Sequence, residues 1–565
     1  MWIILCATEV RRRFCCSFAG DAFVHSGMKT DLLNRFGPVV LSATAILSFV
    51  AFKWSFLGLP LFWDEAWVYG PAARAMYSNG LSLLPNTIGT ELSRGHPLLF
   101  QFLSACWMHV FGTSNFALHA FALTVSVLLL AVVYILGCRL ASNWVGLSSV
   151  VLVILSEPFL AQSGILLPEI MLSLCVLIAI GAYITKSIIG TILSISAALL
   201  IKESAVVLVL ALLCWHFLAW AMRIEPRSLR DRRRWTMYLA APLLIGLAFH
   251  TYQRFAYGWF FYPEHLGLMS WDVRDIHYTF KLAYRDLFEQ QGMEWATLAF
   301  GLIVPLAWKK WSRRWLPVLV VLLYICAIKV LDGKWALPPL PTILVTLFCF
   351  AVIMFLQIIP LARQEPRVGE FLGIAMIFTW GFILFSSINF FSDRYLMSAV
   401  PLIAIAFSGM LYSALNEWHK VLFPIAITSI AVILFAGIGA DDRVGDTRLS
   451  YRDSIAIESQ LIAACDSLEL HDDPILCSFA EQVYMTSTSA GYLPGVPFKA
   501  PTQVLSTETR HALITNFAQA MNEDAQELRN RLKRGGFEER VTFSVGKANG
   551  QLYSRVANDQ VPDHP

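Results

Sequence analysis

The stretch FALHAFALTVSVLLLAVVYILG, residues 116–137, decides the fold of this chain because it contains no Asp, Glu, Lys or Arg. An α-helix rises about 1.5 Å per residue, so a run of roughly 20 apolar residues crosses the ~30 Å hydrocarbon core of a bilayer. The stretch therefore predicts a transmembrane helix.

The composition extends this interpretation to most of the chain. Its 565 residues are 57% hydrophobic and 15% charged, with a mean hydropathy of +0.59, whereas a soluble domain is about half apolar and about a quarter charged. We expect an α-helical polytopic membrane protein with about 13 transmembrane helices. Their approximate ranges are 37–53, 115–137, 143–157, 167–185, 188–201, 204–222, 236–253, 295–308, 316–329, 338–359, 370–388, 395–413 and 421–439.

Basic residues in the connecting segments predict the orientation, since cytoplasmic loops are enriched in Lys and Arg. With a cytoplasmic N-terminus the inner segments carry 20 basic residues and the outer ones 11. The asymmetry favours this orientation, and 13 crossings then leave the C-terminus outside. The 43 basic and 40 acidic residues of the whole chain nearly cancel, so no nucleic-acid partner is indicated.

Three parts follow from this topology: a cytoplasmic segment 1–36, a transmembrane domain 37–440 with a first outer loop 54–97, and a charged domain 441–565. The last part holds 12 basic and 18 acidic residues. DPILCSF predicts a buried strand, NEDAQELRNRLKRGG a helix ending at its glycines, and RVTFSVGKANGQLYSRV a hairpin turning at Asn549-Gly550. These features predict a small extracytoplasmic α/β domain, in which Cys465 and Cys477 either pair or remain free.

The first outer loop contains LFWDEAWVYG, Leu61–Gly70, in which two adjacent carboxylates lie between tryptophans. Neighbouring helical residues point about 100° apart, so Asp64 and Glu65 are expected to have different tasks. Partial desolvation beside Trp63 and Trp67 predicts a raised pKa for the acid, suited to a general base. The alternative is an ordinary interfacial belt of acids and aromatic residues.

Other polar residues are predicted at the same outer depth. They are His96, Glu169, Lys202, Glu203, Lys334, Arg394 and Tyr395. A single basic residue at a helix end often only extends to the lipid headgroups. Acids that activate a hydroxyl, combined with cations that hold a phosphate, are nevertheless what transfer from a lipid phosphate requires.

Several stretches resemble the GT-C glycosyltransferases that use polyprenyl-phosphate sugars, a superfamily that includes the protein O-mannosyltransferases and the lipid A aminoarabinose transferases. The similar stretches span about residues 37–415 and include PLFWDEAWVYGPAARAMYSNG, GHPLLFQFLSACWMHVFG, FALHAFALTVSVLLLAVVYILGCRLAS, SEPFLAQSGILLPEIML, KWALPPLP and RYLMSAVP. The resemblance implies a GT-C-like fold. The loop motif reads HPLL where the family more often has HPPL, and Glu169 stands where the family usually has Asp.

The resemblance also implies roles for individual residues. Asp64, Glu65 and Glu169 are the expected catalytic acids, with Asp64 activating the acceptor hydroxyl. A divalent metal, Mg²⁺ or Mn²⁺, is a possible cofactor at Asp64 and Glu169, because hard cations prefer oxygen ligands. The residues assigned to binding of the donor phosphate are Lys202, Lys334, Arg394 and Tyr395, with Lys334 and Arg394 as alternatives for the main contact. Positioning of the substrate is assigned to His96 and Tyr69.

The expected function is transfer of a sugar from a polyprenyl-phosphate donor to a hydroxyl-bearing acceptor, a protein, lipid or glycan, at the extracytoplasmic face of a membrane such as the bacterial inner membrane. A multi-span transporter remains an alternative, although it should carry ionisable residues near the middle of the membrane. A non-catalytic membrane scaffold or receptor is the other alternative.

Overall fold

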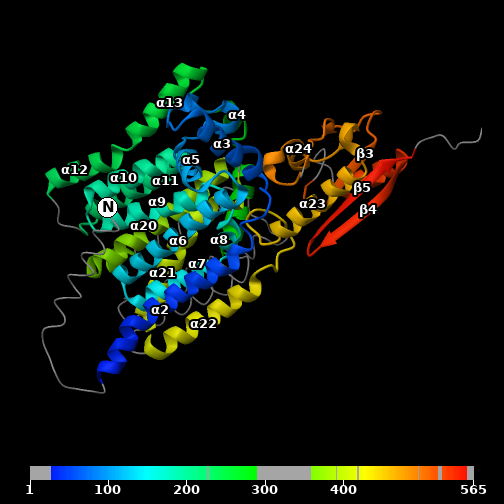
Figure 1. Ribbon diagram of the computed structural model, residues 1–565. Coiled ribbons are helices and arrows are strands. Elements are labelled where there is room, and N and C mark those ends of the chain that lie inside the picture. The colour runs from blue at the N-terminus through cyan, green and yellow to red at the C-terminus, as the bar shows by residue number, and fades with distance from the viewer. Residues whose placement is uncertain are drawn as a thin grey trace, which may run out of the picture.

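The computed structural model describes residues 27–224, 228–288, 358–389, 391–415, 419–493, 495–518 and 525–556. The predicted spans 295–308 and 316–329, nearly all of 338–359, and Lys334 lie outside these residues. The described part is mainly helical and ends in a small sheet (Figure 1).

The described elements before residue 440 are all helices, and they are α-helices except for the π-helix η1 and the 3₁₀ helices η2, η3 and η5. They are α2 (Gly27–Trp54), η1 (Glu65–Tyr69), α3 (Gly70–Asn79), η2 (Pro85–Thr87), α4 (Thr90–Ser93), α5 (Leu99–Phe111), α6 (Asn115–Leu140), α7 (Asn143–Leu155), α8 (Glu157–Gln162), α9 (Glu169–Ile184), α10 (Ile188–Ile201), η3 (Glu203–Ala205), α11 (Val206–Ala221), α12 (Leu229–Ala240), α13 (Leu243–Tyr257), α14 (Pro263–Gly267), α15 (Val273–Phe288), α19 (Ile359–Gln364), α20 (Pro366–Ile388), η5 (Asp393–Ser398), α21 (Val400–Leu415) and α22 (His419–Gly437).

Four segments of the described chain are helical, long enough and apolar enough to cross a membrane: Phe36–Trp54, Asn115–Leu140, Glu203–Ala221 and Pro366–Ile388. Six shorter apolar helices accompany them. Helix α6 begins where the Ser114 side chain accepts a hydrogen bond from the Ala117 amide, as an N-cap residue does. These helices make the chain an integral, polytopic membrane protein, as predicted.

Two predicted spans differ from the structure. The span 236–253 is not one helix, because α12 ends at Ala240 and α13 begins at Leu243. Pro242 lies at this break, and proline lacks the amide hydrogen that a continuous helix needs. The span 395–413 begins late, at Val400, because residues 393–398 form the tighter 3₁₀ helix η5.

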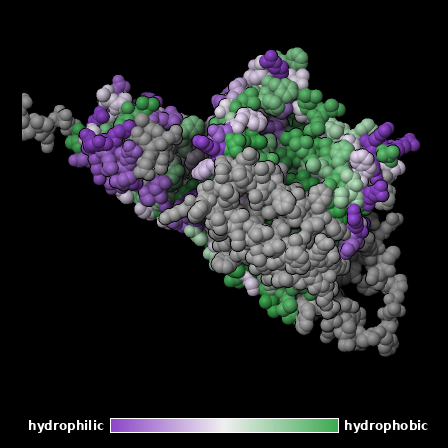
Figure 2. Space-filling model, turned by 180° about the vertical axis from the view of Figure 1, so that it is seen from behind, coloured by the Kyte–Doolittle hydropathy of each residue, from purple (hydrophilic) through white to green (hydrophobic). Residues whose placement is uncertain are grey.

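Helices α2, α6, α21 and α22 surround α7, which contacts each of them, and Figure 1 shows them side by side. Hydrophilic residues gather over the C-terminal elements, whereas patches of hydrophobic residues are visible on the helical part (Figure 2). The membrane part and the charged C-terminal part therefore differ in surface as they do in sequence.

The C-terminal elements form an α/β unit. They are α23 (Tyr451–Ser467), η7 (Leu470–Asp472), β1 (Ile475–Leu476), α24 (Phe479–Thr486), η8 (Thr488–Ala490), β2 (Pro501–Thr502), β3 (His511–Thr515), α25 (Ala525–Arg534), β4 (Phe537–Val545) and β5 (Ala548–Arg555). The sheet order is β2-β1-β3-β5-β4, with β1 parallel to β2 and β3 and the other pairs antiparallel.

The predicted strand, helix and hairpin of this part are present, but the turn is not where the sequence indicated. Strand β4 ends at Val545 and β5 begins at Ala548, so Gly546 and Lys547 form the turn and Asn549-Gly550 lies inside β5. Gly546 has φ +54°, which glycine adopts without a steric penalty. Cys465 and Cys477 are buried free thiols.

Candidate active site

The Asp64 loop is held by contacts on both sides of the acid. The Leu61 amide donates to the Ala490 carbonyl at 2.8 Å, and the Trp63 amide donates to the Tyr484 hydroxyl at 2.9 Å. Trp63 has φ +46°, a left-handed conformation that is uncommon for a bulky residue. These contacts fix the backbone that leads into the π-helical turn η1.

Glu65 points away from Asp64 into the protein interior. Its Oε2 accepts from the Phe62 amide at 3.0 Å, and its Oε1 accepts from the Leu166 amide at 2.7 Å and lies 2.8 Å from His119 Nε2. The side chain is 1% exposed. Glu65 therefore braces the loop against α6 and the segment before α9, in keeping with different tasks for the two acids.

Asp64 faces two donors. Its Oδ1 accepts from Trp67 Nε1 at 2.9 Å, and its Oδ2 pairs with the Arg394 guanidinium from η5. At 22% exposure the Asp64 side chain is more open than that of Arg394, at 10%. Asp64 is thus the member of this pair that an incoming group reaches most easily.

The pKa of Asp64 differs from the sequence-based expectation. Burial raises it, but the Arg394 guanidinium and the Trp67 hydrogen bond outweigh that effect and hold the pKa below the ordinary value of 3.8. The predicted rise was wrong because Arg394, 330 residues away in sequence, could not be paired with Asp64 by inspection.

Three carboxylates and two cations meet here. Besides Asp64, Arg394 contacts Asp446 through Nη1 at 2.9 Å and Glu169 through Nε at 3.7 Å. Lys202 Nζ donates to Glu169 Oε1 at 2.9 Å. We call Asp64, Glu169, Lys202, Arg394, Tyr395 and Asp446 the Asp64 cluster.

Aromatic rings border the two cations. Lys202 Nζ lies 4.0 Å from the centroid of the Tyr395 ring, and the Arg394 guanidinium carbon lies 5.4 Å from it. Tyr69 is buried beside the cluster, and this burial raises the pKa of its hydroxyl. Tyr69 therefore stays a neutral hydroxyl at neutral pH, next to Lys202 and Glu169.

The cluster also contains polar atoms without hydrogen-bond partners. Among the described residues, buried Glu169 Oε2 and Arg394 Nε make no hydrogen bond. Buried groups of this kind are rare and costly. The geometry thus leaves both an acceptor and a donor available in the residues that surround the Arg394 guanidinium.

The predicted residue His96 does not belong to this cluster. His96 hydrogen-bonds Glu203 instead of a member of the cluster. Asp446, which the sequence did not indicate, joins through the loop between α22 and α23. The only feature of the sequence that pointed to Asp446 was the high density of charged residues that begins at residue 441.

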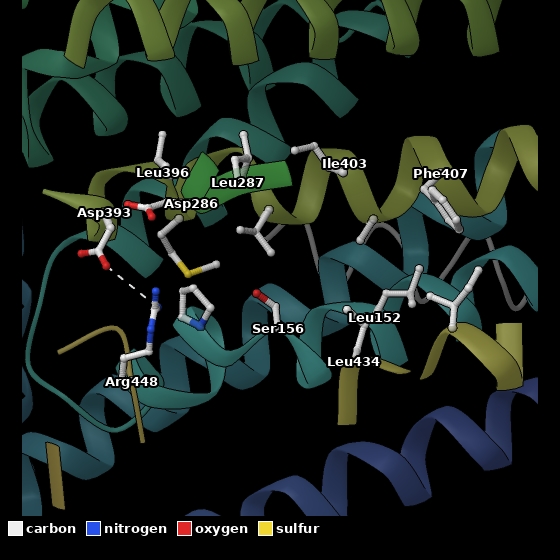
Figure 3. A pocket seen from close by; sticks show the side chains of 15 residues that line it. Leu152, Ser156, Asp286, Leu287, Asp393, Leu396, Ile403, Phe407, Leu434 and Arg448 are labelled. Carbon is white, nitrogen blue, oxygen red and sulfur yellow. Dashed lines mark ion pairs between the residues drawn. The ribbon is translucent and has the colours of Figure 1, made fainter. Parts of the chain in front are cut away.

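An apolar pocket adjoins η5 on the side that carries Asp393, Leu396 and Met397. Its walls come from α7, α15, α21 and α22, and its polar end is formed by Asp286, Asp393 and Arg448 (Figure 3). Arg394 is the next residue after Asp393. The same short helix therefore contributes to the Asp64 cluster and to this apolar pocket.

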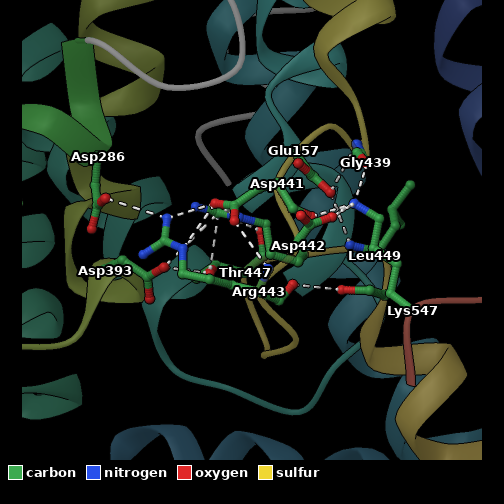
Figure 4. Close-up of polar contacts among 12 residues, drawn as sticks. Glu157, Asp286, Asp393, Gly439, Asp441, Asp442, Arg443, Thr447, Leu449 and Lys547 are labelled. Carbon is green, nitrogen blue, oxygen red and sulfur yellow. Dashed lines mark hydrogen bonds and ion pairs between the residues drawn. The ribbon is translucent and has the colours of Figure 1, made fainter. Parts of the chain in front are cut away.

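A polar network closes the end of this pocket (Figure 4). Thr447 donates to Asp393 at 2.6 Å, and Arg443 pairs with Asp286 at 3.4 Å. Glu157 accepts from the amides of Gly439 and Leu449 at 3.3 and 3.2 Å. These contacts fasten the segment that carries Asp446 onto the helical part.

No protein-family model matches the chain, and no curated protein sequence matches it.

Solved structures are similar to it. ArnT from Cupriavidus metallidurans bound to undecaprenyl phosphate is 12% identical, with 93% of this chain and 99% of that chain covered and a TM-score of 0.45. The Archaeoglobus fulgidus oligosaccharyltransferase in its apo form is 12% identical, with 93% and 75% covered and a TM-score of 0.44. The S. cerevisiae protein O-mannosyltransferase Pmt1-Pmt2 complex bound to the sugar donor is 16% identical, with 39% and 34% covered and a TM-score of 0.29.

Proposed function

We propose that this chain is a membrane glycosyltransferase that transfers a sugar from a polyprenyl-phosphate donor to a hydroxyl-bearing acceptor at the extracytoplasmic face. The observation that carries the proposal is the contact of Asp64 with Arg394, beside Lys202 and Glu169. This contact brings a partly exposed acid together with two cations at the ends of apolar helices. Displacement of a lipid phosphate requires these groups.

In this proposal Arg394 and Lys202 bind the donor phosphate. Guanidinium and ammonium groups in a partly desolvated site stabilise the charge that develops on a leaving phosphate. Glu169 holds Lys202 at 2.9 Å and so positions it. The apolar pocket beside η5 suits the isoprenoid tail, because its walls are mostly Leu, Ile, Val, Met and Phe.

Asp64 then acts on the acceptor. When the donor phosphate engages Arg394, it competes with Asp64 for the guanidinium, and the carboxylate becomes free to accept the proton of the attacking hydroxyl. The hydroxyl oxygen bonds to the anomeric carbon as the bond from that carbon to the phosphate oxygen breaks. The lipid phosphate leaves with the electron pair, and a single displacement of this kind inverts the anomeric centre.

The proposal needs no divalent cation between Asp64 and Glu169. Arg394 faces both carboxylates and Lys202 pairs with Glu169, so two side-chain cations already supply the positive charge that Mg²⁺ or Mn²⁺ would bring to these acids. No step of the proposed reaction passes through a metal at this position.

The proposed topology has residues 1–36 in the cytoplasm, 37–440 in the membrane with the loop 54–97 outside, and 441–565 outside the cell membrane of a bacterium. The position of the charges favours this enzyme over a transporter. Glu169 is the first residue of α9 and Lys202 directly follows α10, whereas a transporter site near mid-membrane is built from interrupted helices.

The test is transfer by purified full-length protein. We expect Asp64→Asn to reduce transfer from a polyprenyl-phosphate sugar by at least about 1000-fold, in the range of losing a catalytic base and its charge, with unchanged yield and detergent-solubilised size. The matched control is Asp442→Asn, because the Asp442 side chain is 99% exposed. Full activity of Asp64→Asn would refute the proposed chemistry.

Mass analysis of the cell envelope with and without the protein identifies the acceptor.

A further inference from the structure

Two histidines and a glutamate from three distant segments meet beside the Asp64 cluster. His96 lies between α4 and α5, Glu203 begins η3, and His265 lies in α14. Each side chain offers one possible ligand atom, and these three atoms lie within 4.8 Å of one another. The sequence predicted a role in substrate positioning for His96 and no role for Glu203 or His265.

The contacts among the three are close to those of a ligand set. His96 Nδ1 lies 2.8 Å from Glu203 Oε2, and the rings of His96 and His265 are 4.9 Å apart at an angle of 36°. Zinc bonds of about 2.0–2.1 Å in tetrahedral geometry separate the ligand atoms by roughly 3.4 Å. Small side-chain rotations therefore bring all three atoms to one ion.

The two nearby cations are each matched by another carboxylate. Arg94 pairs with Glu264 at 2.9 Å, and Lys202 pairs with Glu169 at 2.9 Å. Glu203 therefore remains the acid that faces the histidines. Two imidazoles and one carboxylate match the three-ligand sites in which zinc keeps a fourth, open position.

We infer that His96, Glu203 and His265 form a binding site for a divalent transition metal, Zn²⁺ in the first place. The ion would join the first outer loop, the start of η3 and the segment that contains α14. Since Lys202 directly precedes Glu203, the same ion would fix the backbone that presents Lys202 to Glu169. The site does not depend on the proposed glycosyl transfer.

The test measures binding of the metal alone. Full-length protein without a histidine tag is freed of metal with a chelator and titrated with Zn²⁺ against a chromophoric competitor. We expect one tight zinc per chain, and Co²⁺ in its place should give the visible absorption bands of a four-coordinate ion. Zinc should also raise the unfolding temperature.

Variants distinguish this site from adventitious binding. His265→Ala and Glu203→Gln should each weaken zinc affinity by 10-fold or more and abolish the thermal shift. The control His109→Ala removes a histidine that stacks on Tyr77 at the end of α5 and should bind zinc like the parent. His265 is half-buried in a five-residue helix, so its variant should retain the fold, which the unfolding temperature without metal verifies.

Two results would overturn the inference. One is the absence of a tight zinc in the parent protein, and the other is equal zinc affinity of the parent, His265→Ala and Glu203→Gln. Loss of transfer in Asp64→Asn leaves the expected zinc content unchanged, so failure of this inference and failure of the proposed function are separate outcomes.

Discussion

Arg394 is the residue on which the charges of the site converge. One guanidinium faces the carboxylates of Asp64, Glu169 and Asp446, so a donor phosphate has to compete with them. Asp446 is the weakest competitor, because burial raises its pKa to about 6 despite Arg394. Asp446 therefore becomes neutral at a mildly acidic pH at which a phosphodiester remains charged.

This difference predicts a pH-dependent donor affinity. For the parent protein, the KM for the polyprenyl-phosphate sugar should fall as the pH drops through about 6, because protonation of Asp446 frees Arg394 Nη1. Asp446→Asn should have the low KM at all pH values, up to about 10-fold below the parent at pH 8, as expected for a charge interaction of about 1.4 kcal/mol. Steady-state kinetics between about pH 5 and 8 provide the measurement. A higher KM in Asp446→Asn would contradict the assignment of Arg394 to phosphate.

The sequence predicted that Asp64, Glu169, Lys202 and Arg394 share one depth, and in the structure they are in contact. Depth was predictable because hydropathy marks the helix ends. The pairing was not predictable, since Arg394 lies in the short 3₁₀ helix η5 and Asp446 lies in a loop, and neither segment is long enough to show a periodic pattern. That pairing also reversed the expected shift of the Asp64 pKa.

At the scale of elements, helix α24 supports the active-site loop from the C-terminal side. The Tyr484 hydroxyl accepts a hydrogen bond from the Trp63 amide. The Phe479 ring packs edge-on against the Trp67 ring, with the ring centroids 4.9 Å apart. Trp63 has left-handed dihedrals, and such a conformation persists only where its surroundings enforce it. The C-terminal part therefore helps to orient Asp64.

Tyr484→Phe tests this support. The change removes the part-buried hydrogen bond to the Trp63 amide, which contributes roughly 0.5–1.5 kcal/mol. We expect kcat to fall about 10-fold while the KM for the donor stays near its parent value. Tyr553→Phe is the control, because it removes a similarly buried hydroxyl from β5, away from the loop. Equal kcat values for the two variants would show that α24 does not position Asp64.

Most described helices were predictable because long apolar runs leave little choice in a membrane. The errors came from local stereochemistry, where Pro242 divides a predicted span and Gly546 forms the hairpin turn. Asn-Gly is the commoner two-residue turn. Here, however, Gly550 lies where α23 packs on β5. A Cβ at this position would come within 2.6 Å of the Ile457 side chain and 2.7 Å of the Leu461 side chain, so close packing explains that glycine.

At the scale of the whole molecule, one apolar core runs from the membrane helices into the C-terminal part. The same cluster contains Phe56 and Phe62 after α2 and Tyr451 in α23, and the Phe62 and Tyr451 rings are 5.7 Å apart. Within the C-terminal part this core also buries two acids, Glu458 in α23 and Glu481 in α24. Hydropathy alone gave no sign of either, because acids are ordinary on the polar face of an amphipathic helix.

The two buried acids make stability depend on pH. Burial raises the pKa of Glu481 to about 7 and raises that of Glu458 well above its ordinary value of 4.5. The folded state therefore binds protons more tightly than the unfolded state. Its extra stability is complete below about pH 4.5 and is lost as the pH rises toward 7, by about 1.4 kcal/mol per pH unit for each proton.

Glu458→Gln should remove part of this loss, because a neutral amide carries no charge to bury. We expect the unfolding temperature at pH 8 to rise by about 2–4 °C, the shift that about 1 kcal/mol gives in a domain of 150–250 residues, and its dependence on pH between 5 and 8 to flatten. Glu508→Gln, at an exposed position, is the matched control and should follow the parent curve. Thermal unfolding followed at several pH values is the measurement. A steeper pH dependence in Glu458→Gln would mean that the buried carboxylate is ionised and stabilised by a partner instead.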